Sequence, residues 1–281
     1  PQTGREAEMN FAIPPADTKK VLVAGGGVAG MQAAITCAQR GHKVMLCEKS
    51  GMLGGALRCE QNVPFKEKLD YYLNRQARKV AQAGVEIRLN TEVTPEYAKA
   101  SGADVIIAAL GSRPVKPEIP GIDGRNVISA QDAYTHPEKV GCTAVILGAG
   151  LVGVELAIYL SMQGKKAEVV EMLGEISHGG NMLHVRALNV EIAKYAINIS
   201  FNTKATDITP EGVMCQTPEG EKLIKAETVI YAVGQKPLRE EAAALSLCAS
   251  DYYPIGDCIA VNNIMNATSM AYTVARNVGR K

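Results

Sequence analysis

The sequence repeats VLVAGGGVAGMQAA, residues 21–34, as AVILGAGLVGVELA, residues 144–157. Each copy has a short apolar run typical of a buried strand, the glycine fingerprint G-x-G-x-x-G, and an apolar segment typical of a helix. In such a unit the first glycine allows a tight turn, the second lets the backbone approach a pyrophosphate, and the third lets helix and strand pack closely. The repeat predicts two dinucleotide-binding units with fingerprint glycines Gly25, Gly27 and Gly30, then Gly148, Gly150 and Gly153.

An acidic residue follows each fingerprint at the same distance. The segments KVMLCEK and AEVVEM contain Glu48 and Glu171, each 18 residues after the last fingerprint glycine. A carboxylate there accepts hydrogen bonds from ribose hydroxyls and repels a 2′-phosphate, so both units are predicted to prefer an unphosphorylated ribose. A glycine-rich turn without a ligand explains one copy of this pattern, but not two copies with an acid at matching distance.

The composition and charge of the chain limit the classes of binding partner to be expected. The chain has 281 residues, enough for about two domains, with 47% hydrophobic and 21% charged residues. Thirty Lys and Arg residues against 29 Asp and Glu residues give a formal net charge of +1. Because no block of like charges is present, neither nucleic acid nor a membrane surface is an expected partner. Small-molecule nucleotides are expected instead.

The seven cysteines form no C-x-x-C pair and no paired zinc spacing. They are interpreted as reduced thiols of a cytoplasmic protein, and no metal site is expected. Residues 21–39 carry no charge, but their glycines divide them into strand, turn and helix, which argues against a membrane span. Residues 1–17 are polar, rich in proline and without periodicity, which suggests a linker in a fragment of a longer protein.

Hydrophobic periodicity predicts the other main elements. Helices are expected near residues 66–83 and 181–195, and strands near 85–89, 104–109, 197–203, 213–217 and 228–232. Residues 114–120 contain three prolines and are interpreted as a connection between domains.

Several of these motifs resemble the two-dinucleotide-binding-domain flavoproteins, which include the pyridine nucleotide disulfide reductases. The matching elements are GGGVAG with Glu48, LGG at 53–55, ALG at 109–111, AVG at 232–234 and YPIGDC at 253–258. The resemblance covers about residues 18–281. It implies an α/β fold of two Rossmann-like three-layer domains: an FAD domain from residues 18–113 and 236–281, and an NAD(H) domain, residues 114–235, inserted in it.

The resemblance also implies roles for single residues. Asp257 would approach the FAD pyrophosphate and ribityl chain, the helix from about Asn263 would point its N-terminus at the flavin, and Val93 would contact adenine through its backbone. The residues expected to bind FAD are Gly25, Gly27, Val28, Ala29, Gly30, Glu48, Lys49, Gly54, Gly55, Arg58, Val93, Ala109, Gly111, Gly256, Asp257 and Met265. Those expected to bind NADH are Gly148, Gly150, Leu151, Val152, Gly153, Glu155, Glu171, Met172, Val233 and Gly234.

A narrower resemblance concerns PQTGRE at residues 1–6, EKSGMLGG at 48–55, NVPFKEKL at 62–69 and GLVGVELAIYLSMQGKKAEVVEML at 150–173. These segments are similar to the C-terminal half of NADH:flavin oxidoreductases related to 2,4-dienoyl-CoA reductase, 2-enoate reductase and trimethylamine dehydrogenase. The resemblance implies an upstream barrel with FMN and a 4Fe-4S cluster. This chain would then be the electron-entry module for reduction of an enoate or enoyl-CoA double bond, in an oligomer of unknown order.

Alternatives stay open at this point. The first site could hold ADP structurally, as the resemblance to trimethylamine dehydrogenase allows, or the chain could be a small reductase subunit that feeds a partner protein. Glu155 is the one possible catalytic residue, since an acid there could lie near the nicotinamide, although it could equally be a favourable charge in the first helical turn. Arg58 could neutralise a phosphate or be solvated, Met265 could fill a gap in the core, and Cys258 is expected to be buried. The four histidines are expected at the surface or in capping positions.

Overall fold

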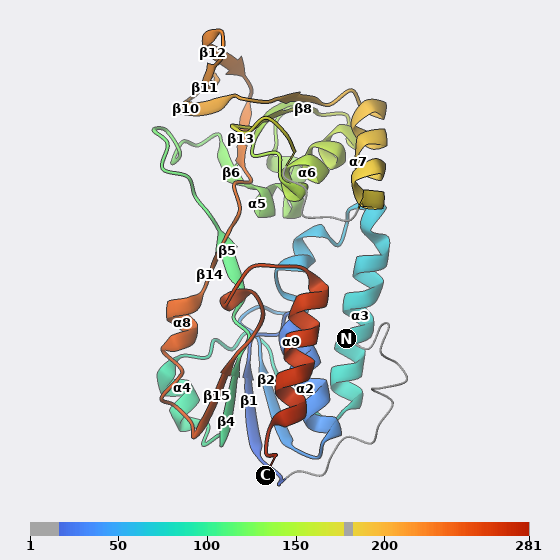
Figure 1. Cartoon of the computed structure of the whole chain (residues 1–281), viewed down its shortest axis with the longest axis vertical. Coiled ribbons are helices and arrows are strands. Elements are labelled where there is room, and N and C mark those ends of the chain that lie inside the picture. Colours follow the sequence, from blue (N-terminus) through green and yellow to red (C-terminus); the bar gives the residue numbers. More distant parts are fainter. Residues whose placement is uncertain (1–16, 177–181, 281) are drawn as a thin grey trace. The chain divides into compact units, whose positions relative to one another are not determined.

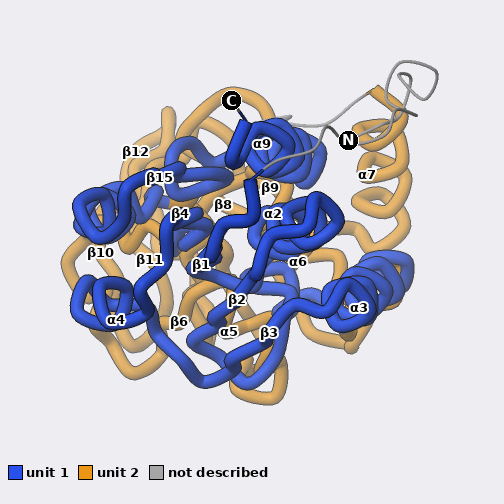
Figure 2. The backbone as a smooth tube through the Cα atoms, turned by 90° about the horizontal axis from the view of Figure 1, so that it is seen from below, with its two compact units in different colours: residues 1–61, 66–113, 236–281 blue, residues 62–65, 114–235 orange. Residues whose placement is uncertain are grey.

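The computed structural model describes residues 17–176 and 182–280, which form two compact units (Figure 2). The first unit takes the described residues up to 61, residues 66–113 and the described residues from 236 onward, and the second takes residues 62–65 and 114–235. Apart from residues 62–65, the chain leaves the first unit after Arg113 and returns to it at Lys236.

The first unit is built on a five-stranded parallel sheet in the order β15-β4-β1-β2-β3. The strands are β1 (Lys20–Ala24), β2 (Lys43–Cys47), β3 (Glu86–Arg88), β4 (Val105–Ala108) and β15 (Asp251–Pro254). The central strands β1 and β4 are nearly continuous apolar runs because both of their faces are covered.

Helices cover both faces of this sheet (Figure 1). Helices α2 (Val28–Gln39), α3 (Glu67–Gln82) and α9 (Ile264–Asn277) pack on one face, where Met31, Leu73 and Ala271 join the core. The short helices α4 (Pro95–Ala100) and α8 (Arg239–Ala243) pack on the other face. Two 3-10 turns, Gly55–Glu60 and Gly256–Cys258, follow strands β2 and β15.

The second unit has its own parallel sheet in the order β6-β13-β7-β8-β9. The strands are β6 (Val127–Ser129), β7 (Thr143–Leu147), β8 (Lys166–Val170), β9 (Asn198–Ser200) and β13 (Thr228–Tyr231). Helices α5 (Ala130–Thr135), α6 (Leu151–Met162) and α7 (Met182–Lys194) belong to this unit, as do the 3-10 turns Pro64–Lys66, in part, and Pro137–Lys139.

A three-stranded antiparallel sheet covers one face of the second parallel sheet. It consists of β10 (Lys204–Thr209), β11 (Gly212–Thr217) and β12 (Gly220–Lys225). Val213, Cys215 and Ile224 from this small sheet pack against Val145 and Val229 of the parallel sheet. The segments β5 (Ser112–Pro114) and β14 (Gln235–Pro237), where the chain passes between units, pair with each other.

The predicted fold class is confirmed: the chain is α/β, with two Rossmann-like three-layer units. The helix expected near 66–83 is α3, and the helix expected from about Asn263 is α9, with Asn263 as its N-cap. The expected helix at 181–195 corresponds to α7, while Asn181 lies outside the described residues. The sequence analysis missed β6, β10 and β12 and helices α4, α5 and α8, all six residues or shorter. Within the described ranges, no helix has the length and apolar character to cross a bilayer.

Candidate nucleotide-binding sites

The first fingerprint forms the turn between β1 and α2, and two of its glycines are required by the protein itself. Gly25 has φ +106°, and a Cβ atom there would lie 2.3 Å from the carbonyl oxygen of Ala109. A Cβ at Gly30 would lie 1.8 Å from the carbonyl oxygen of Gly25. Any larger residue would therefore force the turn away from the sheet.

The middle glycine is different. Gly27 has ordinary extended dihedrals, φ −70° and ψ −174°. A Cβ there would meet only the Cα of Gly55, at 3.9 Å. Neither backbone strain nor packing requires glycine at this position, so the space it leaves is free for a group from outside the chain. Gly27 is also the N-cap of α2 without a side-chain cap hydrogen bond, which leaves the first N–H groups of the helix to an anion.

The second fingerprint repeats this division of roles between β7 and α6. A Cβ at Gly148 would lie 2.7 Å from the carbonyl oxygen of Ala232, and one at Gly153 would lie 2.0 Å from that of Gly148. A Cβ at Gly150, which has φ −72°, would meet no atom of the described chain within 4 Å. Both turns therefore fit a bound pyrophosphate at the same point.

The two predicted ribose acids have a structural role that the sequence analysis missed. The Glu48 carboxylate accepts hydrogen bonds from the backbone N–H of Gly26 and of Ser50, each at 2.8 Å. The Glu171 carboxylate accepts in the same way from Ala149, at 2.7 Å, and from Leu173, at 2.9 Å. Both carboxylates are buried and hold the fingerprint turn in place. Each oxygen keeps acceptor capacity for a ribose hydroxyl.

A pocket of about 130 Å³ opens beside the first fingerprint, and we call it the nucleotide pocket. Seven residues predicted from sequence line it: Gly27, Val28, Ala29, Gly54, Ala109, Gly111 and Asp257. Eight further lining residues were not named as site residues: Ala56, Leu57, Ser112, Ile255, Asn262, Asn263, Ile264 and Ala267. Asn263 was predicted as the start of the helix directed at the flavin, but not as a lining residue. Ala56 and Leu57 carried no sequence signal.

One end of the nucleotide pocket is formed by Asp257 and the N-terminus of α9. The carboxylate of Asp257 accepts from the backbone N–H of Asn262 at 3.2 Å. Burial raises the pKa of Asp257 above its usual value, and the Asn262 hydrogen bond opposes this in part. Asn263 caps α9 by accepting from the N–H of Asn266 at 2.9 Å. The positive end of the α9 dipole therefore borders the pocket.

The other predicted FAD residues lie outside this lining. Gly55 lies against Gly27 of the turn. Gly25 packs against the carbonyl of Ala109, and Gly30 packs against that of Gly25. Lys49 is exposed, Val93 is half-buried, and Gly256 is buried with φ +69°. Met265 is 66% exposed, so it does not fill the core. Arg58 donates to Asp70 at 3.1 Å and to the carbonyl oxygen of Leu53 at 2.8 Å, and it faces a second pocket.

In the second unit, Glu155 lies in the second turn of α6 and is buried. Its carboxylate is 3.2 Å from Nε2 of the half-exposed His184 on α7. Leu151 and Val152 begin α6, and the carbonyl of Val152 accepts from the Tyr134 hydroxyl at 3.2 Å. Three further predicted NADH residues are exposed at the ends of β8 and β13: Met172, Val233 and Gly234.

Of the remaining expectations for single residues, one is confirmed and another is wrong. Cys258 is buried as expected, with its thiol near the carbonyl oxygens of Ile255 and Ala108 at 3.1 and 3.3 Å. The expectation for His42 is wrong: it is buried, and its Nδ1 accepts from the N–H of Lys19 at 3.2 Å. His178 lies outside the described residues. Among residues 17–176 and 182–280, no cluster of side chains has the composition of a metal site.

Comparison with known proteins adds to this geometry. The family model described as pyridine nucleotide-disulphide oxidoreductase matches residues 19–263. An NADH oxidase of Thermoanaerobacter brockii is 35% identical over 285 residues, covering 98% of this chain and 43% of that protein. A cinnamate reductase of Clostridium sporogenes is 36% identical over 283 residues, covering 99% of this chain and 42% of that protein.

The solved structure of a 2-naphthoyl-CoA reductase with 2-naphthoyl-CoA has a TM-score of 0.93 at 30% identity, covering 99% of this chain and 43% of that one. The chain therefore spans less than half the length of these relatives.

Proposed function

Because this chain belongs to the pyridine nucleotide-disulphide oxidoreductase family, an oxidoreductase module that uses FAD and NADH, we propose that its first unit holds FAD and its second unit binds NADH. The proposed reaction is hydride transfer from NADH to FAD. The observation that carries the proposal is the pair of middle glycines, Gly27 and Gly150, for which the surrounding chain gives no reason.

The chain's own part in this reaction is to bind and orient. The free N–H groups at the start of α2 and of α6 would bind the pyrophosphates, helped by the helix dipoles. Glu48 and Glu171, fixed by their backbone donors, would each accept from a ribose hydroxyl. When bound, FAD supplies the hydride-accepting ring, whose reduced form is anionic. The N-terminus of α9 would stabilise that charge.

Glu155 is proposed as the residue of the second unit nearest to the nicotinamide. Its carboxylate is positioned two residues after the last fingerprint glycine and is paired with His184 at 3.2 Å. Hydride transfer itself requires no general acid, so Glu155 would orient the nicotinamide rather than move a proton.

The destination of the electrons is a finer proposal. The relatives are more than twice as long as this chain, and two of them act by name on cinnamate and on an aromatic acyl-CoA. We propose that the whole protein passes electrons from FAD through a 4Fe-4S cluster to FMN in a barrel domain of the same chain. The barrel would reduce an enoate or enoyl-CoA double bond.

An absorption spectrum of the purified chain, followed by anaerobic addition of NADH, tests the proposal for the two units. The expected result is an oxidised-flavin band near roughly 450 nm that bleaches on addition of NADH. A colourless protein that releases ADP on denaturation would instead support a structural nucleotide at the first site. A yellow protein that does not bleach would contradict hydride entry through the second unit.

A further inference from the structure

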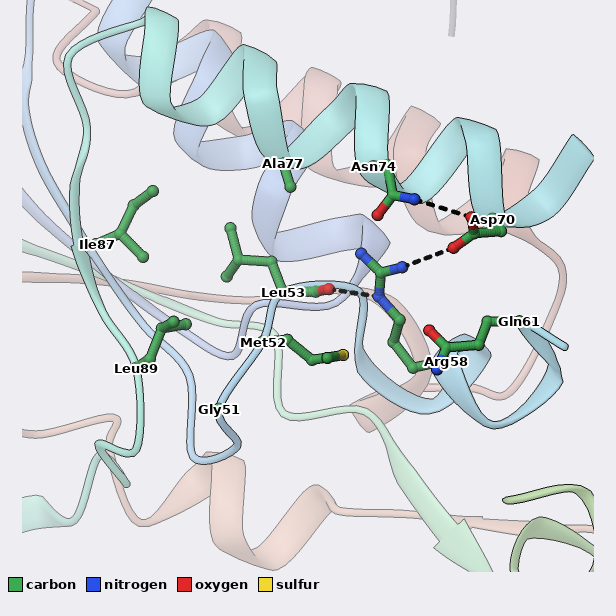
Figure 3. A pocket seen from close by; sticks show the side chains of 10 residues that line it. All are labelled: Gly51, Met52, Leu53, Arg58, Gln61, Asp70, Asn74, Ala77, Ile87 and Leu89. Carbon is green, nitrogen blue, oxygen red and sulfur yellow. Dashed lines mark hydrogen bonds and ion pairs between the residues drawn. The ribbon is translucent and has the colours of Figure 1, made fainter. Parts of the chain in front are cut away.

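A second pocket lies on the far side of the loop that borders the nucleotide pocket. Within the loop of residues 51–58, Gly54, Ala56 and Leu57 line the nucleotide pocket, whereas Gly51, Met52, Leu53 and Arg58 line the second one. Helix α3 and the end of β3 complete its wall (Figure 3). We call it the α3 pocket. Its volume is about 450 Å³, more than three times that of the nucleotide pocket and within the usual range for small-molecule sites.

Hydrogen bonds connect the side chains on the polar side of the α3 pocket. The Nε of Arg58 donates to the carbonyl oxygen of Leu53 at 2.8 Å, and its Nη1 donates to Asp70 at 3.1 Å. The other oxygen of Asp70 accepts from the side-chain amide nitrogen of Asn74 at 2.9 Å. Asp70 therefore fixes both neighbours and balances the charge of Arg58, whose side chain is only 15% exposed. Such a network presents oriented groups without a net charge.

Two polar atoms take no part in these bonds, Nη2 of Arg58 and Oδ1 of Asn74. Figure 3 shows both turned away from Asp70, on the side of the pocket that Arg58 and Asn74 line. One is an obligate donor and the other an obligate acceptor. Together they match a planar group that carries an acceptor next to an N–H donor, as on the edge of an adenine ring.

The remaining wall is apolar and suits the faces of a ring. Leu53, Ala77, Ile87 and Leu89 line it with Met52. Met52 and Leu89 are 49% and 38% exposed, large apolar side chains that a flat ligand would cover.

We propose that the α3 pocket binds the adenine ring of a free adenine nucleoside or nucleotide, at a third site separate from the two fingerprints. Because the loop of residues 51–58 forms one wall of each pocket, an occupant of the α3 pocket would stiffen the loop that carries Gly54 beside Gly27.

Photolabelling with 8-azidoadenosine, followed by peptide mapping, tests this site on the chain as purified. The label is expected on peptides from residues 51–61 or 67–82 as well as on fingerprint peptides. Adenosine should reduce the labelling of residues 51–61 and 67–82 at least about tenfold more effectively than inosine does. On its Watson–Crick edge, inosine has the donor and the acceptor in the reverse order. Label confined to fingerprint peptides, or equal competition by the two nucleosides, would overturn the proposal.

Two variants test whether the adenine ring binds in the α3 pocket. Asn74→Leu should weaken adenosine competition at least about tenfold by removing the acceptor. Ala77→Met should do the same by filling the pocket while leaving the Arg58–Asp70–Asn74 network intact. Arg78→Leu is the matched control, because Arg78 is exposed on the same helix and lies outside the pocket lining. Adenosine should compete with the photolabel on this variant as well as it does on the parent. Unchanged competition in Ala77→Met would refute the site even if Asn74→Leu were to unfold.

Discussion

The two fingerprint turns are nearly identical in backbone and in their clamping acids, but they differ in what surrounds the middle glycine. In the first unit, Gly54 pairs with the turn, donating to the carbonyl of Gly26 at 2.9 Å, and Gly55 lies against Gly27. In the second unit, no described atom would lie within 4 Å of a Cβ at Gly150. A walled site suits a retained cofactor, and an open one suits a substrate that exchanges. This is the division of labour proposed for FAD and NADH.

The largest effect is expected where the protein itself requires glycine. Gly30→Ala and Gly153→Ala place a methyl group 1.8 and 2.0 Å from a carbonyl oxygen. Each should lower the free energy of unfolding by about 3 kcal/mol or more, because the turn must separate from its helix. Urea unfolding followed by circular dichroism measures this loss. Equal stability of parent and both variants would show that the turns are looser than the structure indicates.

Substitution of each middle glycine should impair only its own nucleotide site, without this loss of stability. Gly27→Val is expected to reduce flavin retention at least about tenfold, because the side chain occupies the pyrophosphate position. Gly150→Val should leave the flavin in place and raise the KM for NADH by a similar factor. Flavin content per chain and steady-state kinetics with an artificial acceptor give the two readouts.

Each of these variants serves as the control for the other. The unfolding free energies of both should stay within about 1 kcal/mol of the parent, since a Cβ at either position meets no close atom. If Gly27→Val kept its full flavin content, the first pyrophosphate position would be wrong.

An intermediate effect is expected for Glu171, which has two roles. Glu171→Arg removes the charge that disfavours a 2′-phosphate, so the ratio of kcat/KM for NADPH to that for NADH should rise about tenfold or more. It also removes the acceptor for Ala149 and Leu173, so the variant should lose about 1–3 kcal/mol of stability. Kinetics with both nucleotides and thermal unfolding measure the two effects separately. Loss of stability with an unchanged nucleotide ratio would leave Glu171 only the clamping role.

The smallest effect concerns Asp257. Burial raises its pKa in the folded chain, so its contribution favours folding below the ordinary pKa and is lost as pH rises through the raised value. Between pH 4 and 7 the flavin-free parent should lose slightly more stability than Asp257→Asn, because the half-buried carboxylate is partly screened by solvent. Parallel pH dependences in urea unfolding would contradict a raised pKa.

Periodicity and the repeat predicted the fold from sequence because long apolar helices and doubly buried strands dominate both units. Elements such as β10, β12 and α4 were missed because a segment of six residues contains little periodicity by which to recognise it. The same limit applies to the site. Gly27 and Asp257 could be named from motifs, whereas Ala56 and Leu57 reach the nucleotide pocket only because the loop of residues 51–58 folds back on the turn.

The repeated fingerprint was enough to predict two dinucleotide-binding units, because three glycines and an acid at a fixed spacing are local requirements of a turn that approaches phosphate. It also predicts an unphosphorylated ribose in both units, which the Glu171→Arg variant tests for the second unit. Other contacts could be seen only in the folded chain: Glu48 and Glu171 clamp their turns, Asp70 binds Arg58, and His184 pairs with Glu155. These contacts join segments distant in the chain, and their partners are chosen by packing that no local pattern records.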